Sequence, residues 1–279
     1  MSSHNSQKDF GSHSQKKRSN RVRGNDLYKN LYEHLDKHIN EAHPLVSIIL
    51  PVYNEQNTIK RLIENLPHHD AIEIIVVDDH STDNSLAEIK DVKDHRNLHI
   101  LEHKTNRGYG AALNTGIHYS KGMIFITMDS DGQHHPKDIF TLVEPIFDGE
   151  ADITIGSRYK GSYNYKLPIV KRFGEALLEI GIRFFFGQKV KNNQSGFRAF
   201  HRKTFPIFEN IRFEGYAFTT ELILAAALRD FRIKEVPIDL LGRKHGSSYI
   251  VLYKLLASLF LCMYMYILLN GKRLFKKRF

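Results

Sequence analysis

Two carboxylates follow an apolar run, one residue apart, in the stretch "FITMDSDGQ" (residues 125–133). In extended backbone, residues i and i+2 point to the same side, so Asp129 and Asp131 can aim their side chains at one point. Two like charges at that distance repel unless a cation lies between them. Because Mg²⁺ or Mn²⁺ prefers oxygen ligands and shares its remaining positions with phosphate and water, we predict a divalent-metal site there, with Gln133 as a neutral ligand. The alternative is a solvated turn, for which Asp-Gly is typical.

Acidic residues also follow two earlier apolar runs, in "PVYNE" (residues 51–55) and "VVDDHSTD" (residues 76–83). Carboxylates accept hydrogen bonds from the N–H groups of a nucleobase and from the hydroxyls of a ribose. Three acidic strand ends in succession therefore favour a nucleotide site. Helix capping alone is the alternative explanation for Asp79, Ser81 and Asp83.

A glycine pair, Gly108 and Gly110, begins a predicted helix in "NRGYGAALNTG" (residues 106–116). Backbone N–H groups at a helix start attract phosphate. Two glycines are weak evidence alone, and they gain weight only because the neighbouring acidic motifs belong to the same predicted sheet edge.

The elements that must position these residues alternate between apolar runs and amphipathic segments. The predicted strands cover residues 46–52, 72–77, 99–102 and 123–128, and the predicted helices cover residues 59–66, a segment through Leu86 and Ile89, and residues 108–120 and 136–147. Strands that are apolar throughout are covered on both faces, as in a parallel sheet between helices. We therefore expect an α/β sandwich that binds its ligands beyond the carboxyl ends of the strands.

The sequence divides into four parts. Residues 1–24 form a polar, basic tail that we expect to be disordered, and residues 25–44 form an amphipathic helix ending near Pro44. Residues 45–248 form the α/β domain, whose second half holds a helical region at 168–186, a polar loop, a helix at 219–229 and a strand at 233–236. Residues 249–279 form an apolar helix and a basic tail.

The formal net charge of +9 is concentrated at the two ends of the chain. Residues 1–23 carry six basic side chains and one acidic one, and residues 271–279 carry five basic side chains and no acidic one. The remaining body is close to neutral, so we expect no nucleic-acid partner, whereas basic ends suit an anionic membrane surface. A solubilising arm is the alternative for the N-terminal tail.

With Cys262 as its single cysteine and no apolar segment after the start, the chain fits a reducing compartment, by default the cytoplasmic face of a membrane.

The stretch at residues 249–269 is long enough to cross a membrane and holds one charge, Lys254. The residues after Lys254 would span only about 22 Å at roughly 1.5 Å per residue, and a hydrocarbon core is about 30 Å thick. A crossing would also place the basic end on the outer side, against the positive-inside tendency. We expect an interfacial helix, with a spanning helix or a helix buried against protein as alternatives.

The ordered set of motifs resembles family 2 glycosyltransferases of the GT-A fold, most closely the dolichyl-phosphate mannose or glucose synthase branch. The motifs are "PVYNE", "DDHSTD", "NRGYGAALNTG", "MDSDGQHHP", "GSRY", "SGFR" and "RKHGSS". The resemblance covers about residues 45–248 and implies a Rossmann-like sandwich. It implies a D-x-D-x-Q metal motif for Mg²⁺ or Mn²⁺ at Asp129, Asp131 and Gln133. The donor-binding residues it implies are Pro51, Tyr53, Glu55, Asp78, Asp79, Asn106, Gly108, Asp129 and Ser130.

The branch also implies the acceptor. A polyprenyl phosphate is already an anionic nucleophile and needs positioning rather than deprotonation. The resemblance assigns catalysis to Asp131, Arg158 and Arg198, and assigns an acceptor phosphate to Arg172, Ser195, Arg243 and Ser247. For each arginine, a surface ion pair is the alternative. His134, His135 and His245 are not expected to be metal ligands, because sixteen histidines make proximity alone weak evidence.

Asn192 departs from the family, which usually carries Asp three residues before the serine of "SGFR". Without any Trp, the chain also lacks the Q-x-x-R-W acceptor motif of processive synthases. Hexose transfer from a nucleotide sugar to polyprenyl phosphate is the main hypothesis. Transfer to a sugar hydroxyl and a non-catalytic nucleotide-sugar binding protein are the alternatives. The sequence leaves open whether the nucleotide is GDP or UDP, whether the hexose is mannose or glucose, and whether the protein forms a homo-oligomer.

Overall fold

The computed structural model describes residues 27–38, 45–92, 97–163, 169–215, 217–242 and 252–276. The predicted tail at residues 1–24 lies outside the described residues, as do parts of the predicted helix at 25–44. Arg243, His245 and Ser247 lie outside them as well.

The described residues form one seven-stranded sheet with the strand order β3-β2-β1-β4-β6-β5-β7. The strands are β1 (Val46–Val52), β2 (Ile72–Asp78), β3 (Leu98–Glu102), β4 (Ile124–Thr127), β5 (Ile153–Tyr163), β6 (Arg198–His201) and β7 (Ile233–Leu240). Only β6 runs antiparallel to its neighbours, β4 and β5, so the sheet is mostly parallel as expected.

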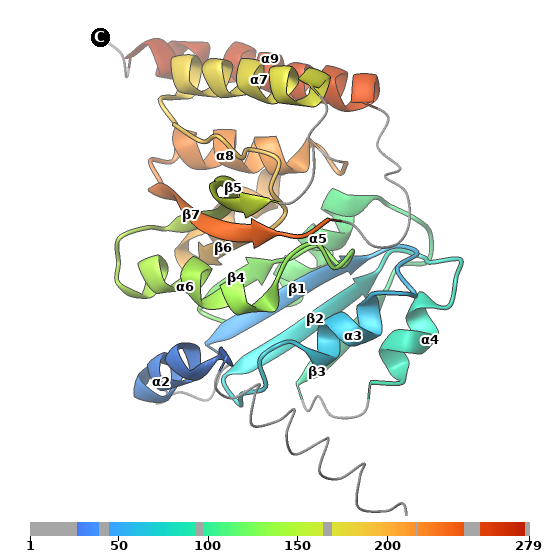
Figure 1. Cartoon of the computed structure of the whole chain (residues 1–279). Coiled ribbons are helices and arrows are strands. Elements are labelled where there is room, and N and C mark those ends of the chain that lie inside the picture. Colours follow the sequence, from blue (N-terminus) through green and yellow to red (C-terminus); the bar gives the residue numbers. More distant parts are fainter. Residues whose placement is uncertain are drawn as a thin grey trace, which may run out of the picture.

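Helices cover both faces of this sheet (Figure 1). They are α2 (Lys29–His38), α3 (Ile59–Glu64), α4 (Ser85–Lys90), α5 (Tyr109–Tyr119), α6 (Ile139–Phe147), α7 (Ile169–Phe186), α8 (Phe218–Leu228) and α9 (Leu252–Lys276), with 3₁₀ segments at Pro136–Asp138 and Arg202–Asn210. Most of these elements lie within a few residues of the positions predicted from the sequence.

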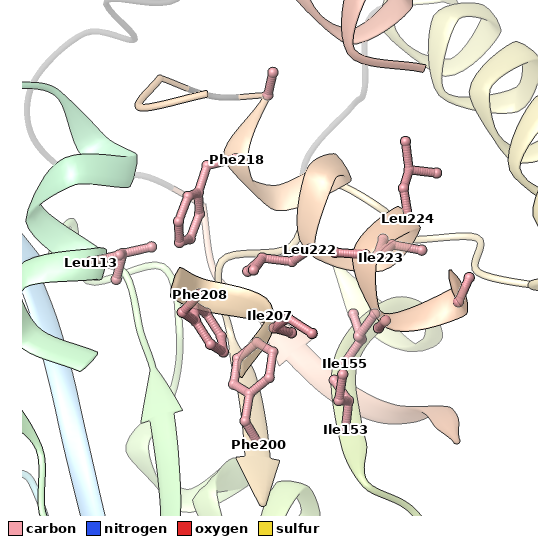
Figure 2. Close-up of a cluster of buried hydrophobic side chains, with 14 of the residues drawn as sticks. Leu113, Ile153, Ile155, Phe200, Ile207, Phe208, Phe218, Leu222, Ile223 and Leu224 are labelled. Atoms are coloured by element: carbon pink, nitrogen blue, oxygen red, sulfur yellow. The ribbon is translucent and has the colours of Figure 1, made fainter. Parts of the chain in front are cut away.

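The two hydrophobic cores explain why the central strands are apolar at every position. In β1, Ile48 and Leu50 belong to the core that includes α2, α3 and α6. Their neighbour Ile49 belongs to the opposite core, with α5 and α8. Figure 2 shows part of that second core, where Phe200 of β6 and Leu222 of α8 lie among other buried side chains. Successive residues of a strand thus each bury their side chain, on alternate faces.

Two helices form a further layer above α8 (Figure 1). Each residue of α8 is buried, because the sheet lies on one side of it and α7 and α9 lie on the other. Gly181 of α7 lets α9 come close, since a Cβ at that position would lie 2.6 Å from the sulfur of Met263. The helices α7 and α9 are therefore packed against each other and against the domain.

The structure differs from the sequence predictions in the second half of the sheet and in the C-terminal segment. The strand β5 is not among the predicted strands. The strand β6 lies in a region that we expected to be a polar loop. Its four residues are too few to show a strand pattern in the sequence.

Within the described residues, no helix is long and apolar enough to cross a membrane. The spanning alternative for the C-terminal segment is therefore not supported. Instead, α9 buries Leu259, Cys262 and Tyr266, a stripe at helical spacing, against the protein.

A buried carboxylate connects α8 to α9. Glu221 of α8 accepts hydrogen bonds from the backbone N–H groups of Arg212 and Phe213, and from the Tyr266 hydroxyl at 2.9 Å. Burial raises the pKa of Glu221, and these donors lower it in part. Because the group is fully buried, each donor compensates part of the cost of removing the carboxyl from water.

We expect Tyr266→Phe to lower the free energy of unfolding by about 1–3 kcal/mol, because Glu221 would keep its burial and lose one donor. The matched control is Tyr264→Phe on the same helix, since the Tyr264 side chain is 59% exposed. Urea unfolding of both variants is the measurement. Equal unfolding midpoints for the two variants would show that the buried hydrogen bond contributes nothing.

Candidate active site

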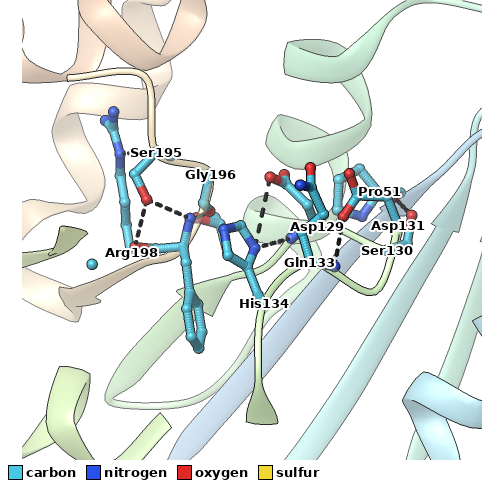
Figure 3. A network of polar contacts seen from close by, with 12 residues as sticks. Pro51, Asp129, Ser130, Asp131, Gln133, His134, Ser195, Gly196 and Arg198 are labelled. Atoms are coloured by element: carbon cyan, nitrogen blue, oxygen red, sulfur yellow. Dashed lines mark hydrogen bonds and ion pairs between the residues drawn. The ribbon is translucent and has the colours of Figure 1, made fainter. Parts of the chain in front are cut away.

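The predicted metal motif lies directly after β4, beside the ends of β1 and β6 (Figure 3). Two hydrogen bonds connect it to the neighbouring segments. The Ser130 hydroxyl donates to the Pro51 carbonyl at 2.7 Å, and the Thr58 hydroxyl donates to the Ser130 carbonyl at 2.9 Å. The motif is thus fixed to β1 and to the start of α3, and Ser130 is buried.

Two side chains contact Asp129: Tyr109 holds its carboxylate from another segment, and His134 Nδ1 accepts its backbone N–H at 3.4 Å. The Tyr109 hydroxyl, at the start of α5, donates to Asp129 Oδ1 at 2.8 Å. Burial, followed by the charge of Asp129, raises the pKa of the Tyr109 phenol well above its ordinary value, so the phenol is a donor. His134 is buried, stacks on Phe197 with ring centroids 5.0 Å apart, and places Nδ1 3.7 Å from Asp129 Oδ2. The Asp129 side chain keeps 31% of its surface exposed.

Asp131 and Gln133 occupy a tight turn. Asp131 Oδ1 accepts the Gln133 backbone N–H at 3.0 Å, and Gly132 between them has a φ of +75°, a conformation that favours glycine. The Gln133 side-chain amide donates to the Leu241 carbonyl at 3.0 Å, which connects the turn to the end of β7. The Gln133 side chain is therefore already positioned through its nitrogen.

The donor set fits a divalent cation that is shared with a ligand. Within the described part of the chain, no group of three or more His, Cys, Asp or Glu side chains forms a metal cluster. Mg²⁺, however, is commonly held by one or two carboxylates together with substrate phosphates. Gly196 leaves the space that this arrangement needs, because a Cβ there would lie 2.5 Å from Tyr109 Oη and closer still to Asp129 Oδ1. Hard oxygen donors in a space kept by glycine suit Mg²⁺ or Mn²⁺.

The two acidic residues after β2 are turned into the protein. Asp79 is buried, and its oxygens accept the backbone N–H groups of Arg107 at 2.8 Å and Gly108 at 2.7 Å. His103 Nδ1 lies 2.7 Å from the same carboxylate. Asp78 is also buried and accepts the Ser81 N–H at 3.1 Å. Asp79 therefore fixes the glycine turn before α5, where Gly108 has a φ of +93°, and donor binding by the two aspartates stays a prediction.

The other predicted donor-binding residues lie near the ends of β1 and β3. Tyr53 is 37% exposed and Asn106 is exposed, so both are accessible to a ligand. Glu55 accepts the Thr58 hydroxyl at 3.1 Å and donates its backbone N–H to Ser85 Oγ at 2.7 Å. The polar loops after β1 and β2 are thus held together by hydrogen bonds.

Arg198 has a different environment from the one that its predicted catalytic role requires. It is 1% exposed, and its three nitrogens donate to the backbone carbonyls of Ser195, Thr219 and Asn193 at 2.7–2.8 Å. Figure 3 shows its guanidinium directed toward α8. Burial lowers the pKa of Arg198 to about 10. Arg198 thus supports the loop before β6, in which Ser195 is also buried and accepts the Phe197 N–H.

Arg158 forms a buried ion pair. Its Nη2 lies 2.8 Å from Glu175 Oε1 and 2.9 Å from Glu175 Oε2, and both side chains are 7% exposed. The Tyr159 hydroxyl donates to the same carboxylate. The pair connects β5 to α7. It matches neither the predicted catalytic role nor the surface ion pair that was its alternative, because the Arg158 charge is compensated inside the protein.

The remaining predicted residues are only partly placed. Arg172 lies on α7, and Arg243 and Ser247 lie outside the described residues. Asn192 is buried, donates its side-chain amide to the Gly156 carbonyl at 3.0 Å, and donates its backbone N–H to Glu235 at 2.7 Å. An aspartate could not make the first bond and would add a second charge near Glu235, which explains why an amide fits here.

Sequence reasoning missed three residues that position the site: Tyr109, His134 and Glu175. Tyr109 lies within the glycine motif, and His134 follows the metal motif, so both were close to residues already selected. Their roles could not be read from spacing, because each depends on a partner from another segment.

The comparisons with known proteins agree with this geometry. A family model described as "Glycosyl transferase family 2" matches residues 47–207. A UDP-N-acetylglucosamine–dolichyl-phosphate N-acetylglucosaminyltransferase of Methanococcus voltae is 31% identical, over 74% of this chain and 90% of that protein. A polyprenol monophosphomannose synthase of Mycolicibacterium smegmatis is 29% identical, over 72% of this chain and 79% of that protein.

Solved structures share the fold. Glucosyl-3-phosphoglycerate synthase from Mycobacterium tuberculosis in complex with UDP superposes with a TM-score of 0.63 at 22% identity, covering 81% of this chain and 80% of that one. The same enzyme with Mn²⁺, UDP-glucose and phosphoglyceric acid gives a TM-score of 0.60 at 23% identity, covering 80% of each chain. The expected GT-A-like fold and family resemblance are confirmed. The chain therefore belongs to glycosyl transferase family 2 and is a glycosyltransferase.

Proposed function

We propose that this enzyme transfers a hexose from a nucleotide diphosphate sugar to a polyprenyl phosphate at a membrane surface, with a divalent cation at Asp129 and Asp131. The observation that carries the proposal is the pair of fixed carboxylates beside the turn before α5. A nucleotide diphosphate fits that edge of the sheet, because a divalent cation held by one or two carboxylates commonly shares its remaining positions with substrate phosphates. The backbone N–H groups at the start of α5, which we expected to attract phosphate, are instead engaged by Asp79 and by the Glu214 carbonyl. The relatives named for dolichyl phosphate and polyprenol support the acceptor.

The chain's residues can perform this transfer without a general base. A phosphate oxygen of the lipid attacks the anomeric carbon, the bond from that carbon to the diphosphate oxygen breaks with inversion, and the nucleoside diphosphate leaves as an anion. Since the attacking oxygen is already ionised, no proton must be removed from it. The protein contributes orientation of donor and acceptor. When bound, the divalent cation would supply positive charge for the leaving diphosphate.

A membrane-facing surface supports the lipid acceptor. The outer sides of α7 and α9 expose apolar side chains at helical spacing, and we call this surface the α7–α9 face. Its members are Leu177, Ile180 and Phe184 on α7, and Leu261, Tyr264, Leu268 and Leu269 on α9. In the sequence, these apolar residues are followed by basic residues at 272, 273 and 276–278, which suit an anionic headgroup layer. We propose an interfacial attachment on the cytoplasmic side, where nucleotide sugars are available.

Asp131→Asn removes one charge while keeping the size of the side chain. We expect it to lower formation of lipid-linked sugar by about 100-fold or more, because cation-assisted charge stabilisation is worth several kcal/mol. The measurement incubates the protein with dolichyl phosphate and a panel of labelled nucleotide sugars, and counts the label extracted into organic solvent. Asp148→Asn, at the exposed end of α6, is the control. A fully active Asp131→Asn variant would refute the metal role, and label in a water-soluble glycan would favour a sugar-hydroxyl acceptor.

The double variant Ile180→Ser/Leu268→Ser tests the α7–α9 face. Both side chains are more than 60% exposed, so their replacement should leave the fold intact. We expect binding to vesicles of mixed neutral and anionic lipid to weaken by roughly tenfold or more, since insertion of each side chain contributes on the order of 1 kcal/mol or more. Co-sedimentation is the measurement, with nucleotide binding unchanged. Leu27→Ser is the control, because Leu27 is 49% exposed and lies two residues before α2, a helix at the other end of the molecule from α7 and α9 (Figure 1). An equal effect of that change would contradict the assignment.

A further inference from the structure

We infer that Tyr109 is a positioning residue whose hydroxyl fixes the orientation of the Asp129 carboxylate for the divalent cation. This inference rests on the proposed function and assigns a new role to a residue of the same site. It starts from one contact, the hydrogen bond of 2.8 Å from Tyr109 Oη to Asp129 Oδ1.

A glycine provides the space for the hydrogen bond between Tyr109 and Asp129. Tyr109 comes from the start of α5, Asp129 from the end of β4, and Gly196 from the loop before β6. A Cβ on Gly196 would lie 2.5 Å from Tyr109 Oη and closer still to Asp129 Oδ1, so any other residue would displace one of the two groups. Three segments distant in the sequence therefore converge on this one hydrogen bond.

The segment that carries Tyr109 is itself held rigidly. Asp79 binds the N–H groups of Arg107 and Gly108, and the Gly110 N–H donates to the Glu214 carbonyl at 2.6 Å. A Cβ on Gly110 would lie 2.6 Å from the same carbonyl oxygen, so the approach of the two segments requires glycine. Tyr109 lies between these anchors, so its backbone is held on both sides.

The chemistry of the contact suits a cation site. A neutral phenol orients a carboxylate and leaves its negative charge intact. A lysine or arginine at the same place would cancel that charge. The bond engages Oδ1, and the Asp129 side chain keeps 31% of its surface exposed, which leaves room for a cation. Groups that hydrogen-bond a metal ligand from behind typically change metal affinity by about 10–100-fold when they are removed.

Tyr109 also joins two parts of the site. Asp79 fixes the backbone immediately before Tyr109, and Tyr109 fixes Asp129. The glycine turn before α5 and the carboxylate that we propose binds the cation are therefore held by one short segment.

The test compares Tyr109→Phe with Tyr119→Phe in the full-length protein. The control removes a hydroxyl from the same helix, where Tyr119 is 40% exposed and lies 3.3 Å from His99. Free Mn²⁺ is titrated by electron paramagnetic resonance in the presence of UDP and, separately, GDP. We expect Tyr109→Phe to raise the Mn²⁺ dissociation constant about 10–100-fold, with an unchanged melting temperature and with transfer activity largely restored at saturating Mn²⁺. The control should match the wild type.

Gly196→Ala keeps the Tyr109 hydroxyl and separates it from Asp129 by displacing one group or the other, so it should weaken Mn²⁺ binding in the same direction. Gly271→Ala, with open space around it on α9, is its control. Wild-type Mn²⁺ affinity in both Tyr109→Phe and Gly196→Ala would overturn the inference while leaving the proposed function intact. Lack of Mn²⁺ binding and of lipid transfer in the wild type would instead remove the proposed function, and this inference with it.

Discussion

Negative charge at the carboxyl edge of the sheet is the constraint on which the site depends. Several aspartates follow the ends of β2 and β4, where like charges repel and burial costs free energy. The protein offsets this cost by giving the carboxylates hydrogen-bond donors: backbone N–H groups for Asp78, Asp79 and Asp131, and a phenol for Asp129. The acidic edge is therefore rigid, and Asp129 keeps an accessible surface.

Arg158 and Arg198, which we expected to be catalytic residues, instead stabilise the segments around the site. Arg198 donates to three backbone carbonyls and holds the loop that contains Gly196. Arg158 is neutralised by Glu175 and connects β5 to α7. A buried guanidinium that already binds a carboxylate or backbone carbonyls of the protein is poorly suited to bind the phosphate of a substrate. We therefore expect positive charge for the proposed acceptor phosphate to come from other residues of the chain or from the proposed cation.

The layer of α7 and α9 connects the site to the proposed membrane surface. One stripe of each helix packs on the domain, and the opposite stripe is apolar and exposed. Arg158 and Glu175 connect the inner side of this layer to β5, and Glu221 and Tyr266 connect it to α8. The layer is thus part of the domain, which would place a lipid surface at a fixed position relative to the sheet.

The sequence by itself determined the elements and the edge at which the acidic motifs meet. Apolar runs such as residues 46–52 and 72–77 predicted the parallel strands, because burial on both faces leaves a local pattern. Only the tertiary structure decided the partners of Arg158 and Arg198, the contact of Tyr109 with Asp129, the place of β6, and the packing of α9. Those features depend on side chains that meet from distant segments. A local pattern records whether a residue is buried, but it does not record which residue lies against it.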